Sequence, residues 1–154
     1  TGQDPDNAPT TSTGTGGSTT EEQTKPDATI LKLQKTLNRL QIRDSRGKAL
    51  LEDGWIGPAT RSATAKFNQI MGFGSSGNAG LATWDALEAI LEKPILWENH
   101  AQGAAVRYVQ FRISTDVDGI YGPGTAEAVK TFQTSRKIDV DGVIGPQSWE
   151  KLIG

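Results

Sequence analysis

The chain has 154 residues, a formal net charge of −2 and 35% hydrophobic residues, a composition that fits one or two small globular domains. Cysteine is absent, so disulfides, zinc–thiolate sites and thiol catalysis are excluded, and His100 is the only histidine. No uninterrupted apolar run approaches the roughly 18 residues that indicate a membrane-spanning helix.

Residues 1–27 are rich in Thr, Ser, Gly and Pro and contain almost nothing apolar. Such a segment cannot offset the entropy lost on ordering, so we expect a flexible linker. Its Gly-rich stretch lacks the Lys of a phosphate-binding loop, and no apolar strand precedes it. A linker in this position leads us to expect a further domain ahead of it.

A first helix is predicted directly after this segment. Asp27 is a favoured N-cap residue, and Ile30, Leu33, Leu37 and Leu40 then recur at helical spacing.

The most informative signal is an Asp-Gly-x-x-Gly-Pro phrase that occurs three times: EDGWIGPAT at 52–60, DVDGIYGPGT at 116–125 and DVDGVIGPQS at 139–148. Asp-Gly favours a tight turn because the carboxylate accepts a nearby backbone N–H and Gly tolerates positive φ. Gly-Pro then begins a helix, because Pro at the first helical position loses no hydrogen bond. The residues assigned to these structural turns are Asp53, Gly54, Gly57, Pro58, Asp118, Gly119, Gly122, Pro123, Asp141, Gly142, Gly145 and Pro146.

The chain also matches itself. A shift of 65 places residues 53–87 on 118–152 without a gap, and a shift of 76 places ILKLQ at 30–34 on VRYVQ at 106–110. The first copy therefore carries 11 extra residues, within QIRDSRGKALLE. Two copies of one module are predicted. The predicted organisation is a linker at 1–27, repeat 1 at 28–93, a connector at 94–102 and repeat 2 at 103–154.

Each copy is expected to contain three short helices, so the predicted fold class is all-α, with two tandem three-helix modules after a flexible linker. The apolar residues of the second and third helices are Ala59, Ala63, Phe67 and Ile70 with Trp84, Leu87 and Leu91 in repeat 1, and Ala128, Val129 and Phe132 with Trp149 and Leu152 in repeat 2. Ile95, Leu96 and Trp97 in the connector are expected to pack the two copies together.

The Asp-x-Asp-Gly element also suggests a calcium loop, and this interpretation is rejected. An EF-hand loop needs Gly at position six and a bidentate Glu at position twelve. With Gly119 or Gly142 at position six, position twelve is Thr125 or Ser148. We therefore expect no specific calcium site, no other metal site and no cofactor.

DGIYGPGTAEAVKTFQTSRKIDVDGVIGPQSWEKL at 118–152 resembles the peptidoglycan-binding domain family, three-helix modules appended to bacterial and phage cell-wall hydrolases. The family pattern has Leu-Gln in helix one, the phrase followed by Phe-Gln in helix two, and a second phrase that leads into helix three. Repeat 1 departs from this pattern, with Ile56 for an aromatic residue, Asn68 for Gln, and SGNAGLATW in place of the second phrase.

This resemblance implies a non-catalytic, carbohydrate-binding region of extracellular, wall-associated location. Its partner would be peptidoglycan or an associated wall polymer. The region would anchor a hydrolase domain, of an endolysin or autolysin, that lies N-terminal to the linker.

Catalysis by the chain itself is not expected. Glu98 and His100 supply only two possible metal ligands, which do not make a site. Asp139 and Asp141 lie in an exposed turn phrase, whereas glycoside hydrolysis needs an acid of raised pKa in a cleft.

A basic nucleic-acid-binding or protein-interaction module is the alternative. It rests on six bases at the first helix and the following loop: Lys32, Lys35, Arg39, Arg43, Arg46 and Lys48. However, no aromatic residues are interleaved for stacking, Asp44 and Glu52 interrupt the run, and residues 30–93 carry a net charge of only +3. A solvated helix face, or attraction to the anionic polymers of a cell wall, accounts for the bases as well.

Saccharides and peptides are usually held by an exposed aromatic face and a few polar groups. The candidate ligand-binding residues are Trp55, Tyr121, Trp84, Trp149, Arg39, Arg43, Gln110 and Gln133. For the four aromatic residues core packing is the favoured alternative, and for the two glutamines helix pairing is an equal one.

Overall fold

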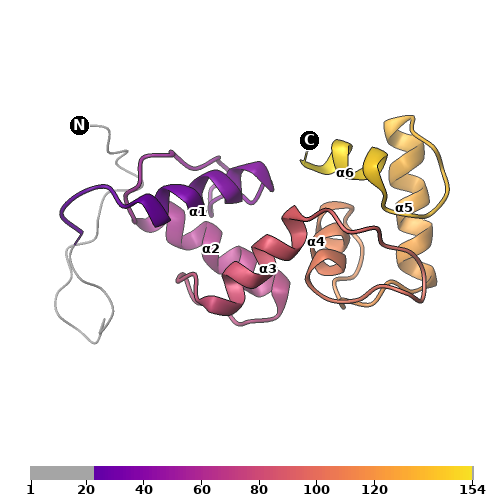
Figure 1. Cartoon of the computed structure of the whole chain (residues 1–154), viewed down its shortest axis with the longest axis horizontal. Helices are drawn as coiled ribbons and strands as arrows, with labels where there is room; N and C mark the ends of the chain where they lie inside the picture. Colours follow the sequence, from indigo (N-terminus) through magenta and orange to yellow (C-terminus); the bar gives the residue numbers. More distant parts are fainter. Residues whose placement is uncertain (1–22, 154) are drawn as a thin grey trace. The chain divides into compact units, whose positions relative to one another are not determined.

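The structure is a computed structural model that describes residues 23–153 (Figure 1). The predicted linker lies mostly outside this range. Six α-helices make up the described part of the chain: α1 (Ala28–Arg39), α2 (Pro58–Met71), α3 (Leu81–Leu91), α4 (Ala104–Arg112), α5 (Pro123–Arg136) and α6 (Pro146–Ile153). Residues 23–153 contain no β-strand, so the all-α class is confirmed. None of these helices combines the length and apolarity that crossing a membrane requires.

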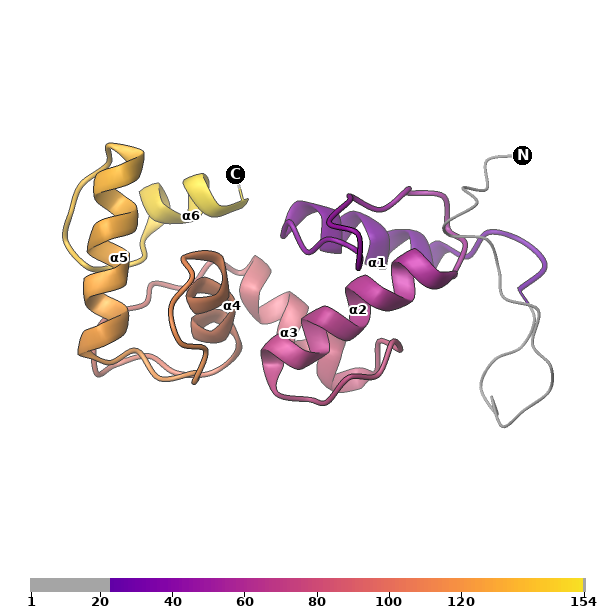
Figure 2. The same cartoon turned by 180° about the vertical axis from the view of Figure 1, so that it is seen from behind.

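Contacts divide the described residues into two compact units. The first unit comprises 23–68 and 74–78, and the second comprises 69–73 and 79–153. α3 therefore groups with α4–α6, and it lies beside α4 in both views (Figures 1 and 2). The sequence self-match instead assigns α3 to repeat 1, at 28–93. The repeat boundaries describe internal similarity rather than contacts, and they stay a prediction.

In the first unit, α1 begins as predicted at Asp27. Its carboxylate accepts hydrogen bonds from the backbone N–H groups of Thr29 (2.8 Å) and Ile30 (3.0 Å), which satisfies two donors that a helix start leaves unpaired. The fully or nearly fully buried apolar side chains of this unit are Leu33, Leu37, Leu40, Ile42, Leu50, Ala59, Ala63 and Phe67.

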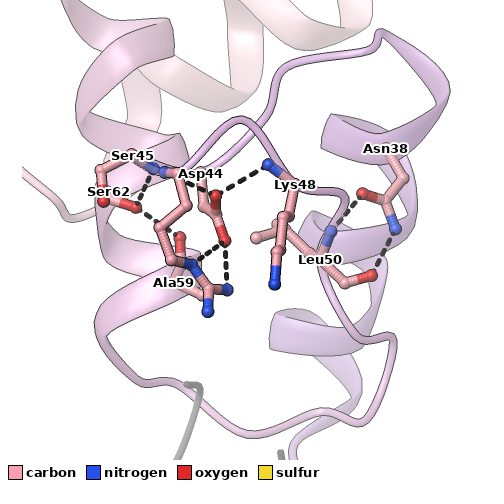
Figure 3. Close-up of polar contacts among 8 residues, drawn as sticks. Asn38, Asp44, Ser45, Lys48, Leu50, Ala59 and Ser62 are labelled. Carbon is pink, nitrogen blue, oxygen red and sulfur yellow. Dashed lines mark hydrogen bonds and ion pairs between the residues drawn. The ribbon is translucent and has the colours of Figure 1, made fainter.

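The extra residues of repeat 1 form an ordered loop around Asp44 (Figure 3). The Asp44 side chain is buried, and its Oδ1 accepts backbone N–H groups of Arg46 (2.8 Å) and Lys48 (2.9 Å). Its Oδ2 pairs with the Arg46 guanidinium at 2.6 Å. The Ser62 hydroxyl accepts the backbone N–H of Ser45 at 3.0 Å, which fastens the loop to α2. The insertion is thus held by buried polar contacts rather than by apolar packing alone.

The core of the second unit centres on aromatic side chains. The rings of Tyr108 and Trp149 stack with centroids 6.4 Å apart, and Trp149 Nε1 donates to the Pro94 carbonyl at 2.7 Å. Burial raises the pKa of Tyr108 to about 12. The other most deeply buried apolar residues of this unit are Leu87, Ile90, Val106, Val109, Tyr121, Val129, Ile144 and Leu152.

Arg107 of α4 joins two turns within the second unit. Its Nη1 donates to the carbonyl of Ile70, near the end of α2, at 3.1 Å. A Cβ on Gly119 would lie 3.0 Å from Arg107 Nε, and one on Gly72 would lie 3.3 Å from its Nη1. The side chain therefore rests on both glycines, each of which has positive φ.

Candidate functional site

A buried glutamine closes the second Asp-Gly phrase. The side-chain oxygen of Gln110 accepts the backbone N–H groups of Asp118 (3.0 Å) and Gly119 (2.9 Å). Its Nε2 donates to Asp118 Oδ1 (2.8 Å), the Ile120 carbonyl (3.0 Å) and Thr125 Oγ1 (2.9 Å). One amide therefore ties the C-terminal half of α4 to the turn and to the first turn of α5.

The same five bonds recur at the other two phrases, at 2.8–3.1 Å. The partners of Gln34 are Asp53, Gly54, Trp55 and Thr60, and those of Gln133 are Asp141, Gly142, Val143 and Ser148. We call each of these five-bond networks a glutamine clasp. Gln34 and Gln110 are 0% exposed and Gln133 is 1% exposed. The amides of the ligand candidates Gln110 and Gln133 are thus buried and committed to the turns.

Repeat 1 has a smaller hydrogen-bond network in the loop before α3, where its sequence lacks a second Asp-Gly phrase. Asn68 takes the position of the clasp glutamine and is 3% exposed. Its Nδ2 donates to the carbonyls of Ser76 (2.8 Å) and Asn78 (3.1 Å). A shorter amide here holds a loop that has no Asp-Gly turn.

Each turn has the form that the phrase predicts. Gly54, Gly119 and Gly142 have φ of +78°, +78° and +74°. The preceding Asp accepts the backbone N–H two residues ahead, at 3.0 Å in all three copies. The hydrogen bond from the Ile120 N–H is the largest cause that holds the pKa of Asp118 below its usual value, and the bond from the Gln110 amide is the second. The prolines at 58, 123 and 146 are the first residues of their helices.

Two equivalent shallow depressions lie over the second and third turns. Asp116, Asp118 and Pro123 line one, and their counterparts Asp139, Asp141 and Pro146 line the other. Residues 23–153 contain no group of three His, Cys, Asp or Glu side chains that is arranged to hold a metal ion. The absence of a specific calcium site stays a prediction. The acidic lining also makes both depressions unfavourable for an anionic ligand.

A larger groove lies between the C-terminal end of α4 and one face of α5. Arg112 and Arg136 are at its edges, Phe132 and Ala128 contribute apolar surface, and no acidic residue lines it. Among the depressions described for residues 23–153, this groove alone is lined by cationic side chains.

The four aromatic candidates divide into two pairs. Trp149 and Tyr121 are 1% and 0% exposed, and the Tyr121 hydroxyl donates to the Gly142 carbonyl. Burial, and then the charges of Asp141 and Glu98, raise the pKa of Tyr121. Trp55 and Trp84 are only partly buried, so both stay candidates for ligand contact.

Sequence reasoning did not select Trp97 as a ligand candidate, yet its side chain is 43% exposed. Its ring lies against that of His100, with centroids 5.5 Å apart. Ile95 is 57% exposed, whereas Leu96 is buried. The sequence does contain a signal for this exposure. Trp97 lies in a segment without helical periodicity, so it belongs to no amphipathic helix face that would have to be buried.

The basic run is less uniform than the sequence suggests. Arg39 is exposed and Arg43 is partly buried, so both can meet a ligand. Arg46, however, is paired with Asp44. The positive charge available to an anionic polymer is therefore smaller than the count of six bases.

Comparison with known protein families identifies a family for most of the chain. The profile of the family described as "Putative peptidoglycan binding domain" matches residues 26–87 and 105–152, which is more than half of the chain. The two segments confirm the tandem modules, and the first ends within α3. No curated protein and no solved structure matches the chain.

Proposed function

The chain belongs to the peptidoglycan-binding domain family, and from this premise we propose that its two modules attach a cell-wall lytic enzyme to peptidoglycan without cutting it. The observation that carries the proposal is the pair of family matches at the two copies of the repeat. The hydrolase domain of an endolysin or autolysin would precede residue 1, and the whole protein would act outside the cell, at the wall.

The chemistry of the turns supports binding rather than hydrolysis. A glycoside hydrolase needs a carboxylic acid whose pKa is raised so that it can donate a proton. Asp118 has the opposite property, because backbone and amide N–H groups stabilise its ionised form and lower its pKa. Asp53 and Asp141 take part in equivalent clasps. These carboxylates serve the turns.

Two modules on one chain suit a repeating polymer. When one module is bound, the other meets its next site at a high effective concentration, so weak individual affinities combine into firm retention. The Thr, Ser and Gly content of residues 1–27 fits a tether between this anchor and a catalytic domain.

Co-sedimentation tests the proposal. The full chain is mixed with purified sacculi, and separately with duplex DNA, over a range of salt concentrations. We expect the protein in the sacculus pellet, no release of soluble wall fragments, and partial weakening at high salt because exposed bases contribute a screened attraction.

The alternative basic interaction module makes a different prediction for the same assay. It predicts retention on DNA with a steep salt dependence and no retention on sacculi. If the protein stays in the supernatant with sacculi from several types of bacterial wall, the proposal is wrong.

A further inference from the structure

The groove between α4 and α5 is the largest of the three depressions described above, at about 430 Å³ against about 240 Å³ and 160 Å³ for the two acidic ones. Ser114 and Arg112 lie on the α4 side. Thr131, Phe132 and Ser135 lie on the α5 side. Ser135 follows Phe132 by three residues and Thr131 by four, so it lies on the same face of the helix as both. α4 and α5 are neighbours in both views (Figure 2).

The two arginines of the groove have no carboxylate partner among residues 23–153. Neutral contacts hold them instead. Arg112 Nη1 donates to the Leu152 carbonyl (2.6 Å) and to the Tyr108 hydroxyl (2.7 Å). The Arg136 guanidinium lies over the Phe132 ring, 5.3 Å from its centroid. Both cations are thus positioned while no carboxylate neutralises their charge. The net charge of residues 94–154, which contain them, is −1.

The hydroxyls of the groove can accept hydrogen bonds. Ser135 Oγ donates to the Phe132 carbonyl at 2.7 Å, and Thr131 Oγ1 donates to the Glu127 carbonyl at 3.2 Å. A hydroxyl has one proton and two lone pairs, so both oxygens keep acceptor capacity for the N–H groups of a bound molecule. The groove therefore combines cationic groups with hydrogen-bond acceptors.

The fold does not require this combination. In repeat 1 the positions of Ser135 and Arg136 are occupied by Ile70 and Met71, which are 8% and 5% exposed. The position of Arg112 is occupied by Thr36, whose hydroxyl donates to a carbonyl of its own helix. The pair of arginines is therefore absent from the corresponding positions of repeat 1, although Lys66 takes the position of Thr131 there.

We propose that this groove binds a short peptide that carries a free carboxylate, with the carboxylate at Arg112 and Arg136 and peptide N–H groups at the hydroxyls of Thr131 and Ser135. The inference rests on the proposed function and makes it more specific, because the peptides of peptidoglycan carry free carboxylates and its glycan backbone offers few. Guanidinium and carboxylate form short, charge-assisted hydrogen bonds with a defined geometry. Repeat 2 therefore recognises the peptide part of the wall.

The test uses the full chain, labelled with ¹⁵N, and the synthetic peptide acetyl-L-Ala-γ-D-Glu-L-Lys. We expect chemical-shift changes at Ser114, Thr131 and Ser135, and at least about tenfold weaker binding of the same peptide with its carboxylates converted to amides. Shift changes confined to the acidic depressions or to Trp97 would place the ligand elsewhere. Equal binding of the two peptides would show that the carboxylate is not recognised.

Variants provide the second readout. Arg136 is exposed, so Arg136→Gln should reduce peptide affinity about tenfold, and the loss of its contact with the Phe132 ring should lower the melting temperature only slightly. Lys151→Gln makes the same change of charge at an exposed position of α6 and should leave affinity unchanged. Thr131→Val removes a groove hydroxyl and should weaken binding by a smaller factor. If Arg136→Gln and Lys151→Gln behave alike, the groove is not the site.

Sacculi distinguish this inference from the proposed function. If the wild type and Arg136→Gln sediment equally and the peptide does not bind, the groove assignment fails and wall binding stands. If neither protein sediments, the proposed function itself fails. If removal of teichoic acid from the sacculi abolishes the difference between wild type and variant, the groove recognises phosphate, and the peptide proposal is wrong.

Discussion

The clasp glutamines satisfy backbone groups that would otherwise be buried without partners. In each turn one side-chain oxygen accepts two consecutive N–H groups, and one amide nitrogen reaches the turn carboxylate, a carbonyl and a hydroxyl. The sequence contains a signal for this role, because Gln110 and Gln133 each precede the Asp of their phrase by eight residues. Nothing in the sequence, however, reveals that these amides are buried. The sequence alone therefore cannot distinguish a glutamine that contacts a ligand from one that holds a turn.

Removal of one clasp should be costly. We expect Gln110→Ala to lower the free energy of unfolding by about 2–3 kcal/mol, because two backbone N–H groups and a Thr hydroxyl lose a buried partner. Urea denaturation measures this change. Gln69→Ala, at an exposed position of α2, is the control and should change it by less than about 0.5 kcal/mol.

The same variant has a signature in pH. The lowered pKa of Asp118 stabilises the fold above the unfolded pKa of this group, and the stabilisation is lost as pH falls through the folded pKa. Without the Gln110 amide, the Asp118 pKa should rise towards its usual value in an NMR titration. An unchanged pKa together with unchanged stability would contradict the role of the clasp.

At the scale of elements, the sequence predicted the helix starts well, because capping is local chemistry. Asp27 and the three Gly-Pro pairs need no tertiary information to favour a helix start. The order of the extra loop could not be predicted in this way. It depends on Asp44 being buried beside Arg46, and isolated charges at this spacing are usually solvated.

The extra loop should depend on this one carboxylate. We expect Asp44→Ala to destabilise the protein by about 2–4 kcal/mol, because it leaves two loop N–H groups and the Arg46 guanidinium without their acceptor. Thermal unfolding measures the loss, and hydrogen exchange at residues 46–48 should become faster. Lys48→Ala, which removes an exposed side chain of the same loop, is the control. Equal behaviour of the two variants would show that apolar packing alone orders the loop.

At the scale of the whole molecule, the sequence predicted two copies but not how contacts group their helices. Self-similarity assigns the third helix of repeat 1 to its own copy, whereas contacts join α3, and the end of α2, to the second unit. A repeat pattern records which residues correspond, whereas the contacts of α3 with α4 determine which helices group together.

Fragments test this grouping. We expect residues 69–153 to unfold cooperatively and residues 94–153 to be markedly less stable, because the shorter fragment loses α3, which contacts α4, and loses the Ile70 carbonyl that accepts from Arg107. Circular dichroism melts and binding of a hydrophobic dye compare the two fragments. Identical melting curves would mean that α3 lies next to α4 without contributing to the stability of the second unit.

The chain separation within the clasps also affects the order in which the protein can fold. Gln110 and Gln133 each reach an Asp eight residues ahead, whereas Gln34 reaches across 19 residues because of the insertion. Closing the longer segment costs about 0.8 kcal/mol more chain entropy. The second and third clasps can therefore close early as local nuclei. The first clasp closes at a lower entropy cost once the Asp44 loop has formed, because the ordered loop shortens the flexible segment between Gln34 and Asp53. The N-terminal repeat, although synthesised first, carries the slower closure.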